Sequence, residues 1–155
     1  MLYDQTLKAI KDLKPSHIVV AFDKKGPTFR HKIYQDYKAT REAAPKELYQ
    51  QIPIVHQVVK AMNIPFYEMK GFEADDIIGT LSKKAGIDNV IVTGDLDALQ
   101  LVDQDTMVYT MRRGVQDTVV YDSKKVKERY GLKPEQLIDY KGFSKVTFIR
   151  FDTLE

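Results

Sequence analysis

The sequence contains no cysteine and only three histidines, His17, His31 and His56. The absence of cysteine excludes disulfides, thiolate zinc sites and cysteine nucleophiles. Three scattered histidines also provide few candidate ligands for a histidine-based metal site. If the protein binds a metal, oxygen atoms must supply the ligands, which favours magnesium, manganese or calcium.

Long apolar segments are absent as well. No run reaches the roughly 18 apolar residues that a membrane-spanning helix needs. Residues 1–20 lack an apolar stretch that ends in a small-residue cleavage site, so nothing indicates secretion. With 155 residues and 43% hydrophobic content, the chain has about the size of one domain and can bury a core. We expect a soluble, cytoplasmic domain.

The net charge of +2 is unevenly distributed along the chain. Residues 1–60 carry 11 Lys and Arg against 6 Asp and Glu, a net of +5, whereas residues 61–110 carry 3 against 9, a net of −6. Residues 111–155 carry 10 against 7, a net of +3. An acidic centre between basic segments suits a metal site beside a surface that binds a polyanion, although ordinary variation in charge gives the same pattern.

The hydrophobic pattern predicts an α/β domain. Apolar spacing predicts helices over residues 2–13, 48–62 and 73–85, and strand-like runs occupy residues 17–22, 65–69, 89–93, 107–111 and 118–121. Helix-start signals predict two further helices, over 124–130 and, opened by Pro134, over 134–141. Pro53 lies inside one helical pattern, so we expect a kink or a break into two helices there. Asp122 or Ser123 can cap the helix at 124–130. Alternation of strands and helices predicts a mainly parallel central sheet.

Acidic residues follow three of the predicted strands, at the carboxyl ends where open parallel sheets bind ligands. In chain order they are Asp23, then Glu73, Asp75 and Asp76 at the start of a helix, and then Asp95 and Asp97. Six negative charges packed together cost free energy unless cations neutralise them. We predict that these carboxylates bind one or two Mg²⁺ or Mn²⁺ ions that activate water and stabilise a leaving oxygen in phosphodiester cleavage. Phosphoryl transfer needs little covalent help from the protein, so the lack of an obvious nucleophile is no objection.

Each acidic group also has a structural explanation. Carboxylates at a helix start are favoured by the helix dipole and by capping. Asp95-Leu-Asp97 can form a turn followed by a helix cap. A single Asp after a strand, such as Asp23, is unremarkable. The conjunction of all three groups at one sheet edge is what favours the metal site.

Residues 24–46 form a basic segment interleaved with aromatic residues. It contains Lys24, Lys25, Arg30, Lys32, Lys38, Arg41 and Lys46, with Phe29, His31, Tyr34 and Tyr37. Cations follow phosphates, and aromatic rings stack on unpaired bases, so the segment is a candidate nucleic-acid surface. A solvated charged loop is the alternative. Arg112-Arg113-Gly114, in the predicted hairpin turn, is a weaker candidate for the same role.

Four motifs in order resemble a known family. They are Val19-Val-Ala-Phe-Asp23, Phe29-Arg-His through Tyr37-Lys-Ala-Thr-Arg41, Gly71-Phe-Glu-Ala-Asp-Asp76 and Thr93-Gly-Asp-Leu-Asp-Ala-Leu-Gln-Leu101. Over residues 2–142 the chain resembles the 5′→3′ exonuclease domain of bacterial DNA polymerase I, of the 5′ nuclease or flap endonuclease group with a three-layer PIN-like fold.

The resemblance implies roles for individual residues. It implies that the six carboxylates bind metal and that the basic segment is a helical arch that threads a single-stranded 5′ end. Arg30, Tyr37, Lys38 and Arg41 would contact the DNA backbone near the cut, with Lys38 and Arg41 as catalytic cations. Lys24 and Lys25 are further candidates for DNA binding.

Two parts of the family pattern have no counterpart in this sequence. The family has a first strand that ends in a metal-binding Asp, before the helix that here spans residues 2–13. After a segment like Leu137-Ile-Asp-Tyr-Lys-Gly142 it continues into a Gly-Asp-x-x-Asp-Asn motif and a helix-hairpin-helix. We therefore expect a 5′ nuclease N-terminal domain at 1–142, with its arch at 24–46, and an atypical tail at 143–155.

Three functions are compatible with the sequence. The first is a metal-dependent 5′→3′ exonuclease or 5′-flap endonuclease that acts on DNA, with a DNA polymerase as a further partner. The lack of the family's first strand and of its Gly-Asp-x-x-Asp-Asn motif could impair this nuclease activity. The second is a non-catalytic fragment that binds nucleic acid. The third is a phosphatase with Asp95 as nucleophile, but the hydroxyl residue expected after Asp-x-Asp in such enzymes is replaced here by Ala98 and Leu99.

Overall fold

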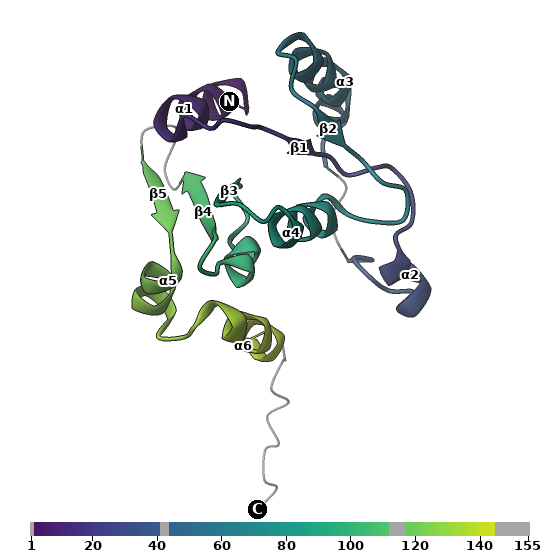
Figure 1. Ribbon diagram of the computed structural model, residues 1–155. Coiled ribbons are helices and arrows are strands. Elements are labelled where there is room, and N and C mark those ends of the chain that lie inside the picture. Colours follow the sequence, from purple (N-terminus) through teal and green to yellow (C-terminus); the bar gives the residue numbers. More distant parts are fainter. Residues whose placement is uncertain (1, 41–43, 112–116, 145–155) are drawn as a thin grey trace, which may run out of the picture. The chain divides into compact units, whose positions relative to one another are not determined.

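The computed structural model describes residues 2–40, 44–111 and 117–144 (Figure 1). The chain divides into two compact units, one of residues 10–83 and one of residues 1–9 with 84–155. Helix α1 (Leu2–Leu13) contributes to both and has the predicted bounds. Within the described residues, no helix is long and apolar enough to cross a membrane.

The unit of residues 10–83 contains a short parallel sheet and three further helices. Strand β1 (Val20–Ala21) pairs with β2 (Phe66–Tyr67), and helices α2 (Phe29–Ile33), α3 (Lys46–Ala61) and α4 (Ala74–Lys84) complete the unit. Backbone hydrogen bonds from Val20 N to Pro65 O (3.0 Å) and from Phe22 N to Tyr67 O (2.9 Å) extend the pairing. The ring of His56 packs against those of Phe22 and Phe66, with centroids 4.2 and 5.1 Å away.

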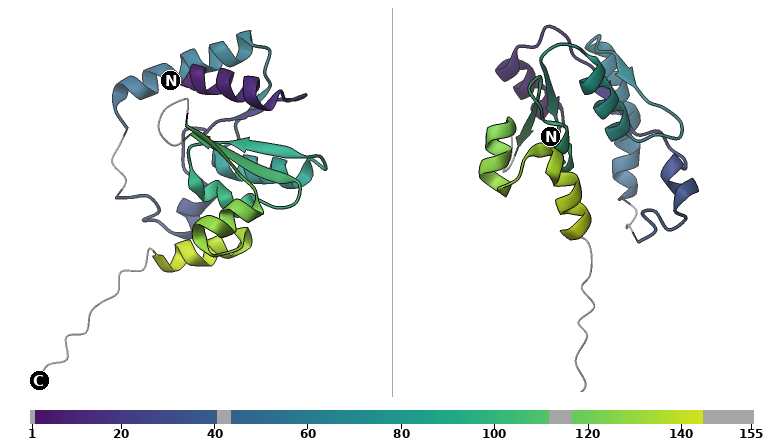
Figure 2. Two further views of the ribbon diagram at one scale, coloured as in Figure 1. Left: turned by 90° about the vertical axis from the view of Figure 1, so that its left-hand side faces the viewer. Right: turned by 60° about the horizontal axis from the view of Figure 1, so that its bottom comes forward.

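The unit that contains residues 84–155 has a mixed sheet. Strand β3 (Asn89–Val92) runs parallel to β4 (Thr106–Met111), which pairs antiparallel with β5 (Thr118–Tyr121). The 3₁₀ helix η1 (Leu96–Leu101) connects the parallel strands, and α5 (Ser123–Tyr130), η2 (Pro134–Gln136) and α6 (Leu137–Ser144) follow β5. Figure 2 shows α5 and α6, in light green and yellow, as neighbours.

The core of this second unit is apolar and closed to water. Leu99, Val108, Val126 and Leu137 have no exposed surface, and Tyr109 and Tyr121 are nearly as buried. Removal of such side chains from water is the main stabilising contribution to a fold of this size. Because Leu99 lies in η1, the same core fixes the loop that carries Asp95 and Asp97.

Several predicted elements are confirmed. The hairpin forms with Val108 opposite Tyr121 and Met111 opposite Thr118. Asp122 caps α5, since its Oδ1 accepts a hydrogen bond of 2.8 Å from the backbone N–H of the third helical residue. Gly131 ends that helix in the left-handed region at φ +69°, a conformation that glycine adopts at little cost.

Two expectations need correction, and one segment without a clear period contains a helix. The strands form two sheets, β1–β2 and β3–β4–β5, rather than one, because among the described residues no strand hydrogen-bonds to both β1 and β3. Residues 46–61 form one helix with Pro53 inside it, so of the kink or break expected there, the break is absent. The basic segment, which has no clear apolar period, contains α2, whose start is fixed by a hydrogen bond from Thr28 N to the His31 side chain (3.1 Å).

Candidate active site

The carboxylates at the start of α4 are partly engaged in capping. The backbone N–H of Glu73 donates to Asp76 Oδ2 at 2.9 Å, and the backbone N–H of Ala74 donates to Asp23 Oδ1 at 2.7 Å. These contacts satisfy N–H groups that have no partner within the helix. Asp75 lies in the same first turn and is exposed. The capping explanation therefore holds for Asp23 and Asp76, and it brings both carboxylates to one helix end.

Side chains of the basic segment reach the same helix end. The guanidinium of Arg30 donates two hydrogen bonds to the carboxylate of Asp76, at 2.7 and 2.8 Å. Lys38 Nζ donates to Glu73 Oε1 at 2.9 Å, and the hydroxyl of Tyr37 donates to Glu73 Oε2 at 3.3 Å. Three residues predicted to contact DNA thus contact two residues predicted to bind metal.

The backbone explains how segments so distant in sequence meet. Gly71 adopts φ +88°, and its carbonyl accepts a hydrogen bond of 2.9 Å from the backbone N–H of Phe29. This bond attaches the first turn of α2 to the turn just before α4. The rings of Phe29 and Phe72 pack beside it with centroids 5.6 Å apart. Arg30, the next residue of α2, consequently lies within reach of α4.

The ion pairs change the acid–base behaviour of three charged groups. The hydrogen bond from Arg30 holds the pKa of Asp76 below its usual value, although partial burial opposes the shift. The hydrogen bond to Asp76 raises the pKa of Arg30 above its already high value. Burial acts to lower the pKa of Lys38, but the hydrogen bond and charge of Glu73 outweigh burial, and the pKa is raised. All three groups are therefore charged near neutral pH.

Aromatic rings accompany these cations, as the sequence pattern predicted. The Arg30 guanidinium lies 4.6 Å from the ring centroid of Phe29, and Lys38 Nζ lies 5.2 Å from that of Tyr37. Such cation–π contacts help to hold a long side chain in one place. Tyr34 is more than half exposed. The segment therefore presents cations and rings on one short stretch of chain.

The second acidic group lies in the other unit and is organised by its own loop. Asp95 Oδ1 accepts a hydrogen bond of 2.7 Å from the backbone N–H of Asp97, and the backbone N–H of Asp95 donates to Thr93 Oγ1 at 3.0 Å. Asp95 is thus the N-cap of η1, as the structural explanation anticipated.

Lys141 is a residue of this second group that the sequence analysis did not single out. From α6, its Nζ donates to Asp97 Oδ1 and, at 2.9 Å, to the carbonyl of Leu96. Its place in the segment 137–142, which resembles the family pattern, was a weak signal. Nothing in the local sequence indicates that a lysine 44 residues away would meet Asp97.

The remaining predicted site residues have simpler surroundings. Lys24 pairs with Glu68 at 2.6 Å on the surface, where its hydrogen bond lowers the pKa of Glu68, and Lys25 is exposed. Arg41 and the Arg112-Arg113-Gly114 turn lie outside the described residues. Their predicted contacts with DNA stay predictions.

The metal-binding role of the six carboxylates stays a prediction. Among residues 2–40, 44–111 and 117–144, no group of three Asp, Glu, His or Cys side chains is arranged to hold a metal ion. Oxygen donors suit a hard divalent cation, but Asp76 and Glu73 have Arg30 and Lys38 as their counter-ions. The donor chemistry fits the predicted ions.

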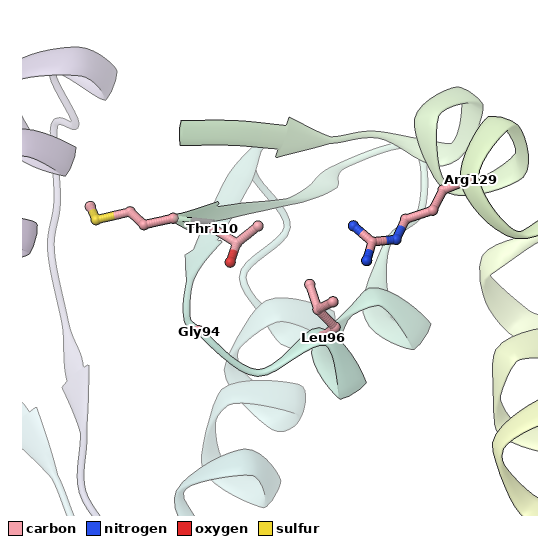
Figure 3. Close-up of a pocket in the computed structure, with 5 residues that line it drawn as sticks. Gly94, Leu96, Thr110 and Arg129 are labelled. Atoms are coloured by element: carbon pink, nitrogen blue, oxygen red, sulfur yellow. The ribbon is translucent and has the colours of Figure 1, made fainter. Parts of the chain in front are cut away.

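An open pocket of about 600 Å³ lies beside the loop of Asp95. Its lining residues come from that loop, from the carboxyl end of β4 and from α5: Gly94, Leu96, Thr110, Met111 and Arg129. Figure 3 shows the side chains of Thr110 and Arg129 directed toward a common space. The lining, as far as the described residues form it, includes no carboxylate.

Known proteins resemble this chain in sequence. A family model described as "5′-3′ exonuclease, N-terminal resolvase-like domain" matches residues 1–131. DNA polymerase I of Bacillus subtilis (strain 168) is 44% identical over 139 residues, which cover 88% of this chain and 16% of that protein. The chain therefore spans less than a fifth of the length of that curated relative.

Solved structures resemble it in fold. A bacteriophage T5 D15 flap endonuclease in a complex with DNA and metal ions superposes with a TM-score of 0.75 at 19% identity, covering 93% of this chain and 57% of that one. A T5 5′-exonuclease with bound zinc superposes with a TM-score of 0.73 at 20% identity. The match covers 90% of this chain and 55% of that one. The expected α/β, PIN-like fold class is confirmed by these likenesses.

Proposed function

Because this chain belongs to the family of 5′-3′ exonuclease N-terminal, resolvase-like domains, we propose that it hydrolyses DNA phosphodiesters at or near a 5′ end. The proposed reaction is that of a 5′→3′ exonuclease or 5′-flap endonuclease. Its substrate is DNA with a single-stranded 5′ end or flap. The relative from Bacillus subtilis is a DNA polymerase I, and we include a DNA polymerase among the proposed partners.

The observation that carries this proposal is the contact between the basic segment and the acidic helix start. Arg30, Tyr37 and Lys38 lie within hydrogen-bond distance of Asp76 and Glu73. A phosphodiester drawn to these cations would therefore lie next to the carboxylates. The guanidinium of Arg30 matches two phosphate oxygens as well as it matches two carboxylate oxygens.

The proposal includes dependence on a divalent cation, Mg²⁺ or Mn²⁺. Such an ion, when bound, lowers the pKa of a water and stabilises charge on phosphate oxygens. Support comes from the oxygen-only donor set of the six predicted carboxylates. Arg30 and Lys38 occupy part of the acceptor capacity of Asp76 and Glu73, and their transfer to a bound substrate would free those oxygens for a metal ion. Phosphate oxygens of the substrate are the natural new partners for both cations.

The test uses the purified chain and a 5′-flap DNA labelled at its 5′ end, with Mg²⁺, with Mn²⁺ or with a chelator. We expect metal-dependent release of the labelled product. Asp75→Ala and Asp97→Ala should each lower the rate by at least about 100-fold, as the loss of a group that stabilises transition-state charge does. Asp88→Ala removes the same charge from an exposed position outside the site and should retain activity.

Two results would contradict the proposal. Equal cleavage rates in the wild-type chain and in all three variants, including the Asp88→Ala control, would show that Asp75 and Asp97 are not needed for the reaction. Binding of the flap DNA without turnover in either metal would favour the second candidate, a non-catalytic nucleic-acid-binding domain. The counter-ion arrangement at Asp76 and Glu73 is the observation that favours that candidate.

A further inference from the structure

Arg129 is exposed, and its guanidinium lies beside two tyrosines rather than beside an acidic residue of the described chain. Its guanidinium donates a hydrogen bond to the hydroxyl of Tyr121 and lies 5.6 and 5.4 Å from the ring centroids of Tyr121 and Tyr130. Within the described part of the chain, no Asp or Glu pairs with it. A hydroxyl and two rings orient the guanidinium but leave its positive charge without a counter-ion.

Thr110 supplies a second polar group to the same pocket. Only 4% of the residue is exposed, and Figure 3 shows its side chain directed into the space that Gly94, Leu96 and Arg129 also line. No hydrogen-bond partner for this hydroxyl occurs among the residues that the structure describes. The hydroxyl can donate a hydrogen bond to a ligand in that space.

The location of the pocket is also typical of a ligand site. Gly94 follows β3 and Thr110 lies near the end of β4, and the two strands are parallel. In α/β folds, ligands bind beyond the carboxyl ends of parallel strands. Asp95 lies between two lining residues, but its carboxylate is turned to the backbone N–H of Asp97. The pocket therefore offers an anion two side-chain donors.

We propose that Arg129 and Thr110 form a phosphate-binding subsite, next to the loop of Asp95 and Asp97, for a backbone phosphate of a bound nucleic-acid strand. The guanidinium provides charge and a pair of parallel N–H donors, and the hydroxyl provides a third donor. This inference rests on the proposed function, because the phosphate belongs to the proposed DNA substrate. The subsite involves none of the residues of the basic segment 24–46.

The test measures binding of a fluorescent single-stranded oligonucleotide by anisotropy, with a chelator present so that no turnover occurs, at several salt concentrations. Arg129→Gln should weaken binding by about tenfold, the effect of one lost hydrogen bond to a charged group, and lower the salt slope by about one. Thr110→Val should weaken binding by about threefold without a change in slope. The matched control, Lys127→Gln, removes the same charge from α5 two residues earlier, about 200° around the helix.

A second measurement identifies the ligand and controls for folding. In amide NMR spectra, the oligonucleotide should shift the signals of Gly94 and Thr110 in the wild-type chain but not in Arg129→Gln. Arg129→Lys keeps the charge and should keep the salt slope while it loses part of the affinity. Thermal melts of each variant show whether loss of the Tyr121 contact has unfolded α5.

The outcomes separate this inference from the proposed function. Equal binding losses in Arg129→Gln and Lys127→Gln would overturn the subsite even if the chain cleaves flap DNA. Shifts at Gly94 and Thr110 with inorganic phosphate but not with the oligonucleotide would overturn the nucleic-acid assignment. An Arg129-specific loss of binding in a chain that shows no cleavage would support the subsite and contradict only the proposed reaction.

Discussion

The two acidic groups of this protein are held in different ways. In the unit of residues 10–83, Asp76 and Glu73 are held by side chains 46 and 35 residues away, those of Arg30 and Lys38. In the other unit, Asp95 is held by the backbone N–H of Asp97, two residues away. One group depends on long-range ion pairs, and the other depends mainly on its own loop.

The carboxylates of a site can be positioned either by local hydrogen bonds or by long-range ion pairs, and the two respond differently to mutation. A capping turn forms wherever the local chain allows it, because its donor and acceptor are covalently close. A bidentate pair between residues far apart in sequence exists only after the fold has brought both partners together, and it contributes more when it is partly shielded from water. We therefore expect the Asp76 group to respond to changes in its partners and the Asp95 group to respond to changes in the core beneath it.

The largest effect should follow from loss of that core. Leu99→Ala truncates a fully buried side chain of η1 and should lower the free energy of unfolding by about 3 kcal/mol, through lost burial and the cavity that remains. Denaturant unfolding measures this change. Ile138→Ala removes a side chain that is 58% exposed and should change stability by less than about 0.5 kcal/mol. Similar losses in both would mean that η1 does not depend on the core.

Removal of Arg30 should have the next largest effect. Arg30→Ala eliminates both hydrogen bonds to Asp76 and should lower the free energy of unfolding by about 1–2 kcal/mol, since a charge-assisted bidentate pair is lost and a carboxylate is left without its partner. Lys24→Ala, which breaks the exposed pair with Glu68, serves as the control and should leave the unfolding midpoint unchanged. An unchanged midpoint in Arg30→Ala would show that the pair does not order this group.

The same pair predicts a pH dependence. The folded-state pKa of Asp76 is lowered, so its contribution to stability is complete above the unfolded pKa of about 4 and is lost as the pH falls through the lowered folded value. The raised pKa of Arg30 keeps that partner charged throughout. Between pH 6 and pH 3, the wild-type chain should therefore lose more stability than Asp76→Asn, measured by denaturant unfolding at each pH. Parallel pH profiles of the two proteins would contradict the ion-pair assignment.

The smallest effect should come from Lys141. Its partner Asp97 has a side chain that is half exposed, so Lys141→Met should lower the free energy of unfolding by no more than about 1 kcal/mol. Hydrogen exchange at the amide of Asp97 should change little, because Asp95 accepts that hydrogen bond. A large increase in exchange there would mean that α6, rather than the loop itself, orders the second acidic group.

Much of the fold and of the candidate site followed from local patterns. Apolar periodicity predicted α1 and α4, because the spacing of apolar residues indicates which face is buried. Two strand-like runs around a turn predicted the β4–β5 hairpin. The cap at Asp122 and the turn at Asp95 followed from residue types that bond to the backbone two or three positions away. Local patterns did not locate the helix α2, since its five residues are too few to show a period and its start depends on the side chain of His31.

The sequence by itself determined that oxygen ligands, cations and aromatic rings would be present, and at which ends of helices and strands they would lie. The tertiary structure decided their partners: Arg30 with Asp76, Lys38 with Glu73, Lys141 with Asp97. It also divided the strands between two sheets and directed Arg129 and Thr110 into one pocket. The physical reason is that capping and periodicity act over a few residues. Ion pairs and pockets depend on where distant segments of the chain come to lie, and no short-range pattern encodes that.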